Sequence, residues 1–422
     1  MDSGKRTVML GWLALLLITP IYYFANLQKV IIPGAAFDEL QQLFSLDAEG
    51  VTRLGAVFLG VYAAAQLVVG VLADRFGGAR VIIAGGAVFC IGSVLSAFTS
   101  SLPLLYFCRF LSGAGAASIY LCMVKEIGRV GGNMMPMLIG IATIIGYSGS
   151  ITGASPFIAG VDKFGYFNMV FWTGIATFAA YSIYVMVACK EGFIPVNKEV
   201  KFNLSSYLAV GKSRQNCALM IAIGISFGTY FALQSTVGKK FLEDFCGLSG
   251  EHAGLVMTVT MIIAALNGFV MANVSRLIGN RRMPVIWFSG FGCCIGALMI
   301  FAGIWLKSSP VLPISGIILM AFAGNISPIY VALIKESNED YRFGTAVCVG
   351  NCFAYAVSAL FGWLAGKLMD VFDPQIVDNV KLYGRDSYLL VFGVLALLGL
   401  ISAVLTLTVK ESKGKNIAAS LR

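Results

Sequence analysis

Long apolar segments recur along the chain and are separated by short polar breaks. Each segment reaches the roughly 20 residues that a helix needs to cross the hydrocarbon core of a bilayer. We therefore predict an all-α polytopic membrane protein with twelve transmembrane helices, over residues 8–33, 51–73, 81–100, 103–127, 135–160, 166–189, 215–238, 248–274, 284–306, 310–335, 342–369 and 387–409.

The longest polar connection, residues 190–214, follows the sixth of these segments. It divides the chain into a first six-helix bundle over 1–189 and a second six-helix bundle over 215–422, which ends in a short tail. Part of the connection, around 203–210, is expected to form a short helix on the membrane surface.

The two predicted bundles share a sequence pattern. The fourth helix ends with IYLCMVKE (119–126), and the tenth ends with IYVALIKE (329–336). Chance explains the tripeptide YFA shared by 23–25 and 230–232, but it explains much less easily the longer pattern at equivalent helix positions. We infer two pseudo-symmetric halves related by an axis along the membrane normal, a common plan of transporters.

Composition supports a membrane protein, because 58% of the residues are hydrophobic and only 12% are charged. Soluble domains carry roughly a quarter charged residues. The net charge of +9 could indicate a nucleic-acid partner. However, eighteen lysines and arginines fall on the side of the termini and eight on the other, which satisfies the positive-inside rule. We predict a multi-pass protein of a bacterial inner membrane with both termini cytoplasmic, no nucleic-acid partner and contact with the lipid bilayer.

The residue inventory argues against several other kinds of chemistry. The ten cysteines are scattered without metal-ligand spacing, and the only histidine is His252. No G-x-x-x-x-G-K-[ST] loop is present, which argues against ATP hydrolysis by this chain. An intramembrane enzyme would need a nucleophile or metal cluster within the spans. We therefore predict no metal, no cofactor and no catalytic residues.

The loop between the second and third helices reads GVLADRFGGAR (70–80). It resembles the signature loop of the major facilitator superfamily, G-x-L-a-D-r-x-G-x-r-r. A degenerate copy, GFVMANVSRLIGNRR (268–282), has Ser275 in place of the aspartate, and RFLSGAGAA (109–117) resembles a further pattern of that family. The resemblance implies a major facilitator fold, with a substrate path between two halves that rock to give alternating access.

Charged side chains at the helix ends on the terminal side are candidates for gating. Asp74 can accept hydrogen bonds from backbone N–H groups at a helix start, or pair with a basic residue. We predict a network that holds this side shut, formed by Asp74, Arg75, Arg80, Lys125, Glu126, Lys335, Glu336 and Arg342.

A charge within the hydrocarbon is costly and is therefore a functional candidate. Arg109 lies within the fourth helix, and the resemblance places such an arginine facing the cavity, where it could pair with an anionic substrate. The alternative is a structural arginine bonded to backbone carbonyl groups. Lys29 lies toward the outer end of the first helix, where functional and structural interpretations are equally open.

Polar and aromatic side chains near the middle of the spans complete a candidate substrate site. Each could instead form a hydrogen bond between helices. Besides Arg109 we include Tyr22, Tyr23, Asn26, Tyr62, Gln66, Tyr147, Tyr230, Gln234, Asn325, Tyr330, Asn351 and Tyr355. No Asp or Glu lies at the middle of a predicted span, which favours an anionic or zwitterionic solute over a cation.

The segment YYFAN (22–26) resembles the Y-Y-x-x-R segment of organic-phosphate antiporters, but Asn26 stands where the arginine would clamp phosphate. We therefore expect a secondary active transporter of a small organic anion, a carboxylate or amino acid, working as a monomer with a coupling proton or a counter-substrate. An organic-phosphate exchanger and a drug or metabolite exporter of the same fold remain alternatives. A membrane sensor without transport is the alternative from another class.

Overall fold

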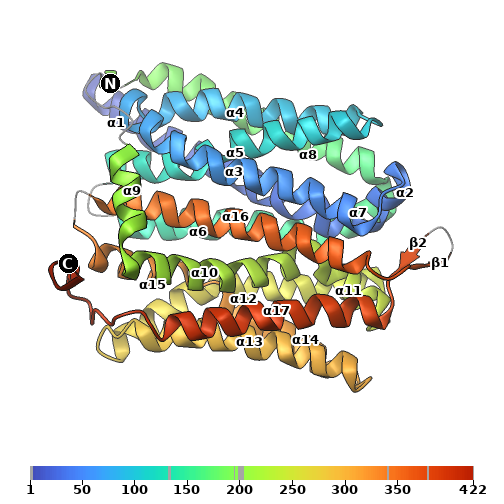
Figure 1. Ribbon diagram of the computed structural model, residues 1–422. Helices are drawn as coiled ribbons and strands as arrows, with labels where there is room; N and C mark the ends of the chain where they lie inside the picture. Colours follow the sequence, from blue (N-terminus) through green and yellow to red (C-terminus); the bar gives the residue numbers. More distant parts are fainter. Residues whose placement is uncertain are drawn as a thin grey trace.

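The computed structural model describes residues 3–131, 135–193, 195–197, 204–339, 342–377 and 380–421, and it is almost entirely helical (Figure 1). The first half contains α1 (Ser3–Val30), η1 (Ile31–Ala35), α2 (Phe37–Phe44), α3 (Ala48–Phe76), α4 (Gly78–Leu95), η2 (Ser96–Phe98), α5 (Leu102–Gly131), α6 (Met135–Thr152), α7 (Ser155–Phe164) and α8 (Tyr166–Glu191). The linker contributes α9 (Leu204–Lys212).

The second half contains α10 (Arg214–Ala232), η4 (Leu233–Val237), α11 (Gly238–Asp244), α12 (Gly250–Leu277), α13 (Met283–Trp305), α14 (Val311–Gly324), α15 (Ser327–Ser337), α16 (Phe343–Met369), β1 (Gln375–Val377), β2 (Val380–Leu382), α17 (Arg385–Thr406) and η6 (Ala418–Leu421). The two short strands pair antiparallel, with Ile376 opposite Lys381.

The predicted membrane spans agree with these helices. Within the described residues, eleven stretches are long and apolar enough to cross a membrane, and α6 with α7 forms a further span bent by 40°. The prediction of twelve spans is confirmed when this bent pair is counted as one. The predicted surface helix near 203–210 is also present, as α9, although part of the predicted linker 190–214 lies outside the described residues.

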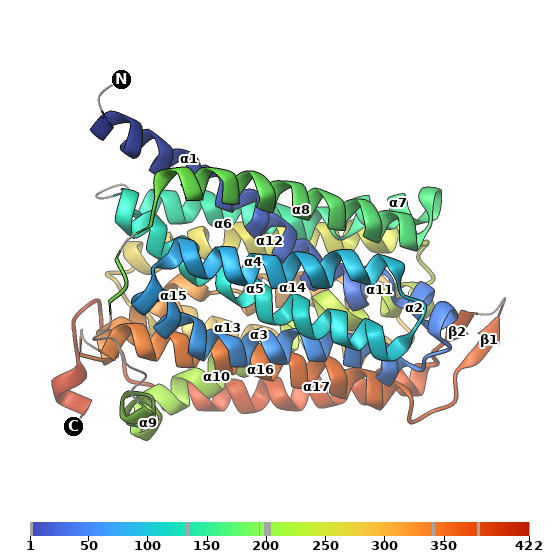
Figure 2. The same ribbon diagram turned by 90° about the horizontal axis from the view of Figure 1, so that it is seen from above.

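The long helices run between two ends of the molecule. Both termini and α9 lie at one end, which we call the terminal face, and α2, α11 and the β1–β2 hairpin lie at the other, which we call the distal face (Figures 1 and 2). Twelve spans place both termini on the same side of the membrane, in agreement with this arrangement.

The halves meet along α3 and α16, which run alongside each other over their whole length. At the distal end the N–H group of Ala48 donates to Asp370, midway the rings of Tyr62 and Tyr355 meet edge to face, and nearer the terminal end Gly70 lies against Cys348. The largest buried apolar cluster also joins the two halves near the distal face, where it includes residues of α2 and α11.

Several predicted continuous helices are interrupted in the structure. The first span passes into η1 at Ile31, where Ile32 has extended dihedrals (φ −125°, ψ 115°) before Pro33. Proline lacks an N–H group and disfavours helical geometry in the residue before it, which accounts for this break. The tenth span breaks between Gly324 and Ser327, and Pro328 stands in the first turn of the helix that follows.

Candidate functional site

A small cavity lies between the two halves, at the level of the break in the tenth span. Its volume is about 40 Å³, room for one or a few water molecules but not for an organic solute. It is lined by Tyr22, Asn26, Lys29, Val30, Tyr147, Ser150, Phe227, Tyr230, Phe231, Gln234, Ser235, Asn325 and Tyr355. Seven of the predicted substrate-site residues are among these: Tyr22, Asn26, Tyr147, Tyr230, Gln234, Asn325 and Tyr355.

The charged residue of this cavity is Lys29 of α1, which is only 4% exposed. Its ammonium nitrogen lies 4.3 Å from the ring centre of Tyr62 and 5.1 Å from that of Tyr355. Among the described residues none forms a salt bridge with it. Two aromatic faces compensate only part of the cost of burying a cation. An anion entering the cavity would supply the missing partner.

The apolar run of the first segment stops near residue 33, so the sequence predicts that Lys29 lies toward the outer end of its helix. In the structure the chain continues through η1 into α2, and Lys29 is buried in the lining of the cavity between the halves. A simple inventory of cations inside apolar segments finds Lys29 and Arg109. Only the folded structure decides which of them faces the cavity.

Arg109 is a correction to the sequence analysis, because its side chain does not line the central cavity. The guanidinium is 2% exposed and donates to the carbonyl oxygens of Leu54 (3.3 Å), Gln28 (3.2 Å) and Ile32 (3.0 Å). It also lies 4.4 Å from the ring centre of Phe58. Three of its donors therefore satisfy backbone carbonyl groups around the break at the end of α1, which is the structural alternative stated above.

Replacing Arg109 with methionine is expected to destabilise the protein rather than to weaken substrate binding. The carbonyl groups of Gln28 and Ile32, at the break that ends α1, would lose their side-chain donor, each at a cost of about 1–3 kcal/mol. Thermal denaturation should show a clearly lower Tm, while Kd for substrate in the surviving folded fraction should change by less than about twofold. An unchanged Tm with lost binding would return Arg109 to the substrate site.

Asn325 links the two halves at the cavity. It stands in the break between α14 and α15, and its amide donates to the hydroxyl of Tyr147 at 2.9 Å and to the carbonyl of Ala264 at 3.0 Å. The amide of Asn267 donates to the carbonyl groups of Phe322 and Asn325, which the break has released from the helix ladder. Asn267 thus stabilises the backbone at the break, and Asn325 connects this break to Tyr147 of the first half.

Five further predicted residues lie outside the cavity lining. Tyr62 stands behind Lys29, as described above, and is therefore next to the site. Tyr330 packs closely against Gly350, and the ring of Tyr23 meets that of Phe24 edge to face. The amide of Gln66 is fully buried beside Tyr62, and Asn351 is half-buried on α16.

The signature loop holds α4 against the end of α5. Gly77 has φ of +85°, a conformation that favours glycine, and a side chain at position 78 would collide with Glu126. Asp74 pairs with Lys125 at 2.6 Å, and Glu126 accepts from the N–H group of Ala79 at the start of α4. The loop and the KE pair of the repeat therefore form one contact within the first half.

The second half repeats this arrangement with different partners. Glu336 receives two hydrogen bonds from Arg282 at the start of α13, at 2.8 and 3.2 Å, and a third from Ser412. Glu126 similarly pairs with Arg129 at 2.6 Å. These ion pairs join residues of the same half.

The remaining predicted gating residues also have local contacts. The guanidinium of Arg80 donates to the carbonyl of Phe76, and Arg75 lies 5.3 Å from the ring of the same phenylalanine. Lys335 lies 5.9 Å from the ring centre of Phe343, and Arg342 is 3.8 Å from Glu339.

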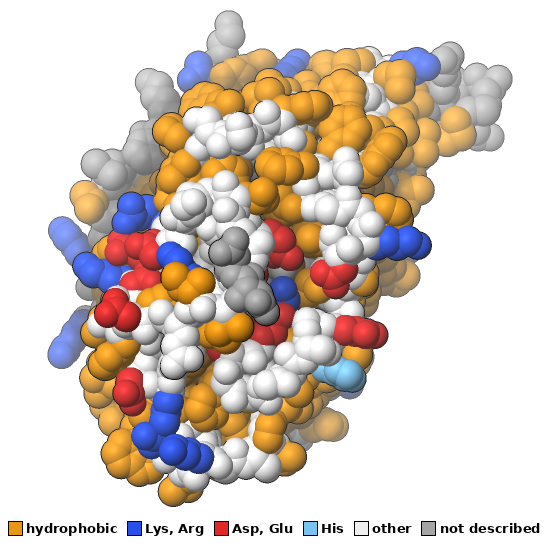
Figure 3. All heavy atoms as spheres, turned by 90° about the vertical axis from the view of Figure 1, so that its right-hand side faces the viewer, with side chains coloured by type: hydrophobic (Ala, Val, Ile, Leu, Met, Phe, Trp, Pro, Cys, Tyr) orange, Lys and Arg blue, Asp and Glu red, His pale blue; other side chains and the backbone are white. Residues whose placement is uncertain are grey.

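Charges at the distal face join the two halves, a contact that the sequence pattern did not predict. We name Asp38, Lys239, Lys240, Glu243 and Asp244 the distal charge cluster. Lys240 of α11 lies 2.8 Å from Asp38 of α2 and 2.9 Å from Asp244, and it is 1% exposed. Lys239 donates to the carbonyl of Ala35 at 3.3 Å and lies 3.4 Å from Glu243. Acidic side chains gather across the middle of this face (Figure 3).

Asp370 makes a second connection at the same face. Its carboxylate accepts from the N–H groups of Ala48 and Glu49, at the start of α3 in the other half, and from the hydroxyl of Tyr383. Burial raises the pKa of the Asp370 carboxyl, although these donors lower it in part. Burial likewise raises the pKa of Glu39 in α2. In this structure the distal side is therefore closed by charges and hydrogen bonds between the halves.

Sequence comparison decides the family. The family model for the Major Facilitator Superfamily matches residues 16–237 and 217–421, nearly the whole chain. The chain belongs to the major facilitator superfamily. Among the described residues no group of three or more His, Cys, Asp or Glu side chains could hold a metal ion. Members of this family are transporters and not enzymes.

Relatives within the superfamily include transporters with stated substrates. The chain is 30% identical to human monocarboxylate transporter 2 over 159 residues, which is 37% of this chain and 31% of that protein. It is 27% identical over 336 residues to the inner membrane transport protein YajR of Escherichia coli, covering 76% of this chain and 70% of YajR. The first of these matches thus spans only about a third of the relative's length.

Solved structures of the superfamily share the fold. A bacterial homolog of the human lysosomal transporter Spinster, in an inward-facing and unoccupied conformation, superposes with a TM-score of 0.76 at 15% identity, covering 94% of this chain and 97% of that one. A D-xylose-proton symporter superposes with a TM-score of 0.71 at 15% identity, covering 95% and 98%.

Proposed function

We propose that this protein is a secondary active transporter of small monocarboxylates, and that Lys29 binds the substrate carboxylate. The observation that carries the proposal is a buried cation in a cavity between the halves, with no salt-bridge partner and no acidic lining residue in the part of the chain that the structure describes. A carboxylate would accept a charge-assisted hydrogen bond from the ammonium group, about twice as strong as a neutral one. The names of several relatives, the monocarboxylate transporters, agree with this substrate class.

The rest of the lining suits a small solute with one charged end. The amides of Asn26 and Gln234 can bond to a hydroxyl or keto group, while Phe227 and Phe231 cover an apolar end. With a volume of about 40 Å³ the cavity must widen to admit such a solute. The ring of Tyr355 both lines the cavity and contacts Lys29, so the substrate displaces this ring as the cavity widens.

The charge of the cavity argues against the other substrate classes. One cation neutralises a monocarboxylate, whereas a doubly charged phosphate would need a further cation at the position of Asn26. A cationic drug would meet Lys29 with no buried acid to balance it. The sugar symporters share only the fold with this chain, at 15% identity or less.

We further propose that the halves rock between two conformations. The distal charge cluster closes the distal side in one of them, and the predicted gating residues close the terminal side in the other. In this structure Lys240 and Asp38 close the distal side. At the terminal side we propose that two separate clusters act as the gate, one with Asp74, Lys125 and Glu126 in the first half and one with Glu336 in the second. Arg75, Arg80, Lys335 and Arg342 are proposed to act with them. The excess of basic residues at the terminal face supports a cytoplasmic location of both termini. One chain contains the whole site, so a monomer suffices.

The charge of Lys29 also bears on coupling. A loaded cavity is neutral, whereas an empty cavity carries an unpaired cation, whose burial is costly. Exchange of one monocarboxylate for another should therefore be faster than net movement. In proteoliposomes, preloading with unlabelled lactate is expected to stimulate uptake of labelled lactate by roughly tenfold. This factor corresponds to a conformational barrier that is about 1.4 kcal/mol higher for the empty protein than for the loaded protein.

The test of the proposed function is uptake by proteoliposomes of a panel of labelled solutes. We expect uptake of lactate or pyruvate that is saturable and competed by other monocarboxylates, and no uptake of glycerol 3-phosphate, xylose or a quaternary ammonium compound. Uptake of one of the latter solutes without uptake of a monocarboxylate would refute the proposal. Equal rates with and without preloading would refute the exchange mode alone.

A further inference from the structure

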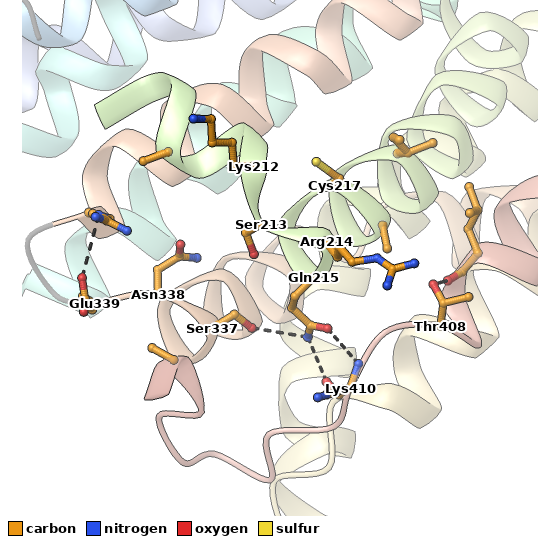
Figure 4. Close-up of a pocket in the computed structure, with 16 residues that line it drawn as sticks. Lys212, Ser213, Arg214, Gln215, Cys217, Ser337, Asn338, Glu339, Thr408 and Lys410 are labelled. Carbon is orange, nitrogen blue, oxygen red and sulfur yellow. Dashed lines mark hydrogen bonds and ion pairs between the residues drawn. The ribbon is translucent and has the colours of Figure 1, made fainter. Parts of the chain in front are cut away.

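A second and larger cavity lies at the terminal face of the second half, far from Lys29. Its volume is about 870 Å³, and it lies around the start of α10, between α9, the end of α15 and the end of α17. Figure 4 shows its lining, in which Arg214 extends across the opening toward Thr408. The two helices that frame this opening begin or end their membrane spans here, at Arg214 and Thr406. The cavity is therefore at headgroup depth.

The mouth of the cavity carries excess positive charge. Lys212, Arg214 and Lys410 line it with exposed side chains, and among the described residues none forms a salt bridge with them. A fourth cation, Arg342, has Glu339 at 3.8 Å. Four cations against one carboxylate give the lining a net positive charge. Such a mouth is complementary to a phosphate group.

The other side of the cavity is apolar and continues into the bilayer-facing surface. Arg214, Ala218 and Ile221 lie on one face of α10, since they are four and seven residues apart. Ile221 is 36% exposed, and Leu405 of α17 completes this side. The rise from Arg214 to Ile221 is about 10 Å along the helix. A free phosphate has no use for such a surface, whereas a phospholipid would place its glycerol and acyl carbons there.

The floor of the cavity is built from buried polar groups and is fixed in place. The amide of Gln215, which is 6% exposed, donates to the carbonyl of Lys410 at 3.0 Å and accepts from its N–H group at 2.9 Å. The amides of Asn216 and Asn338 form two reciprocal hydrogen bonds of 2.9 Å. The cations are thus carried on a rigid support, which lowers the entropic cost of binding.

From these observations we infer that this cavity is a binding site for the phosphate headgroup of an anionic phospholipid, with an acyl chain lying along Ala218, Ile221 and Leu405. The site lies between α9 and α10, which follow each other at the connection between the halves. The hydroxyl of Tyr207 in α9 donates to the carbonyl of Leu67 in the first half at 3.1 Å. A bound lipid would brace this connection. The inference does not depend on the transported substrate.

The test is binding of short-chain lipids to the purified protein in a zwitterionic detergent, followed by native mass spectrometry and by the rise in Tm. Dihexanoylphosphatidylglycerol is expected to bind and dihexanoylphosphatidylcholine to bind at least about tenfold more weakly. The double variant Arg214→Gln/Lys410→Gln should lose about tenfold or more of the affinity for the anionic lipid. Ile221→Gln should also weaken binding without any change in charge.

The matched control is Lys190→Gln/Arg276→Gln, which removes the same charge from exposed positions of the terminal face outside this cavity. It should retain affinity within about twofold. If both double variants lost the same affinity for the anionic lipid, the proposed site would be overturned, because the lipid would then be attracted by the positive charge of the whole surface. Equal stabilisation by glycerol 3-phosphate and by the lipid would overturn the lipid assignment in favour of a soluble anion. Monocarboxylate uptake by the Arg214→Gln/Lys410→Gln variant separates a failure here from a failure of the proposed function.

Discussion

Replacing Lys29 with glutamine is expected to abolish monocarboxylate transport while leaving the protein folded. The substrate would lose its cationic partner in a desolvated site, a loss of about 2–5 kcal/mol, or roughly 30-fold to several thousandfold in affinity. The fold itself should not suffer. Removing a buried cation that has no salt-bridge partner among the described residues relieves a desolvation cost, so Tm should stay the same or rise.

Two further variants make this result specific. Lys29→Arg keeps the charge and should retain part of the binding, although the larger guanidinium crowds a cavity of about 40 Å³. Lys163→Gln removes a lysine from the exposed distal end of α7 and should leave uptake unchanged within about twofold. Normal transport by Lys29→Gln, or a loss explained by a lower Tm, would remove Lys29 from the substrate site.

Replacing Lys240 with methionine should open the distal side of the protein. Lys240 is 1% exposed and pairs with both Asp38 and Asp244, and the side chain of Asp244 is itself fully buried. Removing one partner of a buried ion pair costs about 3–5 kcal/mol, because the other charge is left uncompensated. Opening lets water reach these carboxylates. The equilibrium should therefore move by a factor of roughly a hundred or more toward the distal-open conformation.

The measurement is the distance between spin labels at Gln42 of α2 and Glu251 of α12, both exposed at the distal face, in a background without reactive native cysteines. Lys240→Met should populate longer distances, and adding Asp244→Asn should restore part of the closed population. Arg53→Gln is the matched control, since it removes an exposed ion pair with Glu49 inside one helix and should change little. An unchanged distance distribution in Lys240→Met would exclude a gating role.

The membrane topology could be predicted from the sequence because it depends on local quantities. Span length and hydropathy are properties of each segment alone, and the twelve predicted ranges match the helices within a few residues. The repeat also has a structural basis. Glu126 accepts a hydrogen bond from the start of α4, and Glu336 accepts one from Arg282 at the start of α13, the equivalent helix of the second half. The breaks were missed, because a broken helix is as apolar as an intact one. Pro33 and Pro328 are the residues that signal them.

The site was predicted only in part, because facing and depth depend on tertiary packing. Asn26, Gln234 and Asn325 do line the cavity. Of the two buried cations, Lys29 and Arg109, the sequence favoured Arg109 as the substrate-binding residue. In the structure the guanidinium of Arg109 instead donates to carbonyl groups of α1, η1 and α3. No local pattern states that these carbonyl groups are free to accept. The link between the halves through the distal charge cluster was not predicted, because the ion pair between Lys240 of α11 and Asp38 of α2 spans about 200 residues of sequence.

The most direct test of the central claim is the binding of lactate and of its neutral analogue lactamide to the purified protein. Both compounds have nearly the same shape, so a difference between them reports the negative charge and the second acceptor oxygen of the carboxylate. Stabilisation of only the folded protein raises Tm by mass action. We predict that lactate raises Tm, that lactamide does not, and that Lys29→Gln removes the difference. Equal effects of the two compounds, or a lactate effect that survives in Lys29→Gln, would contradict the account.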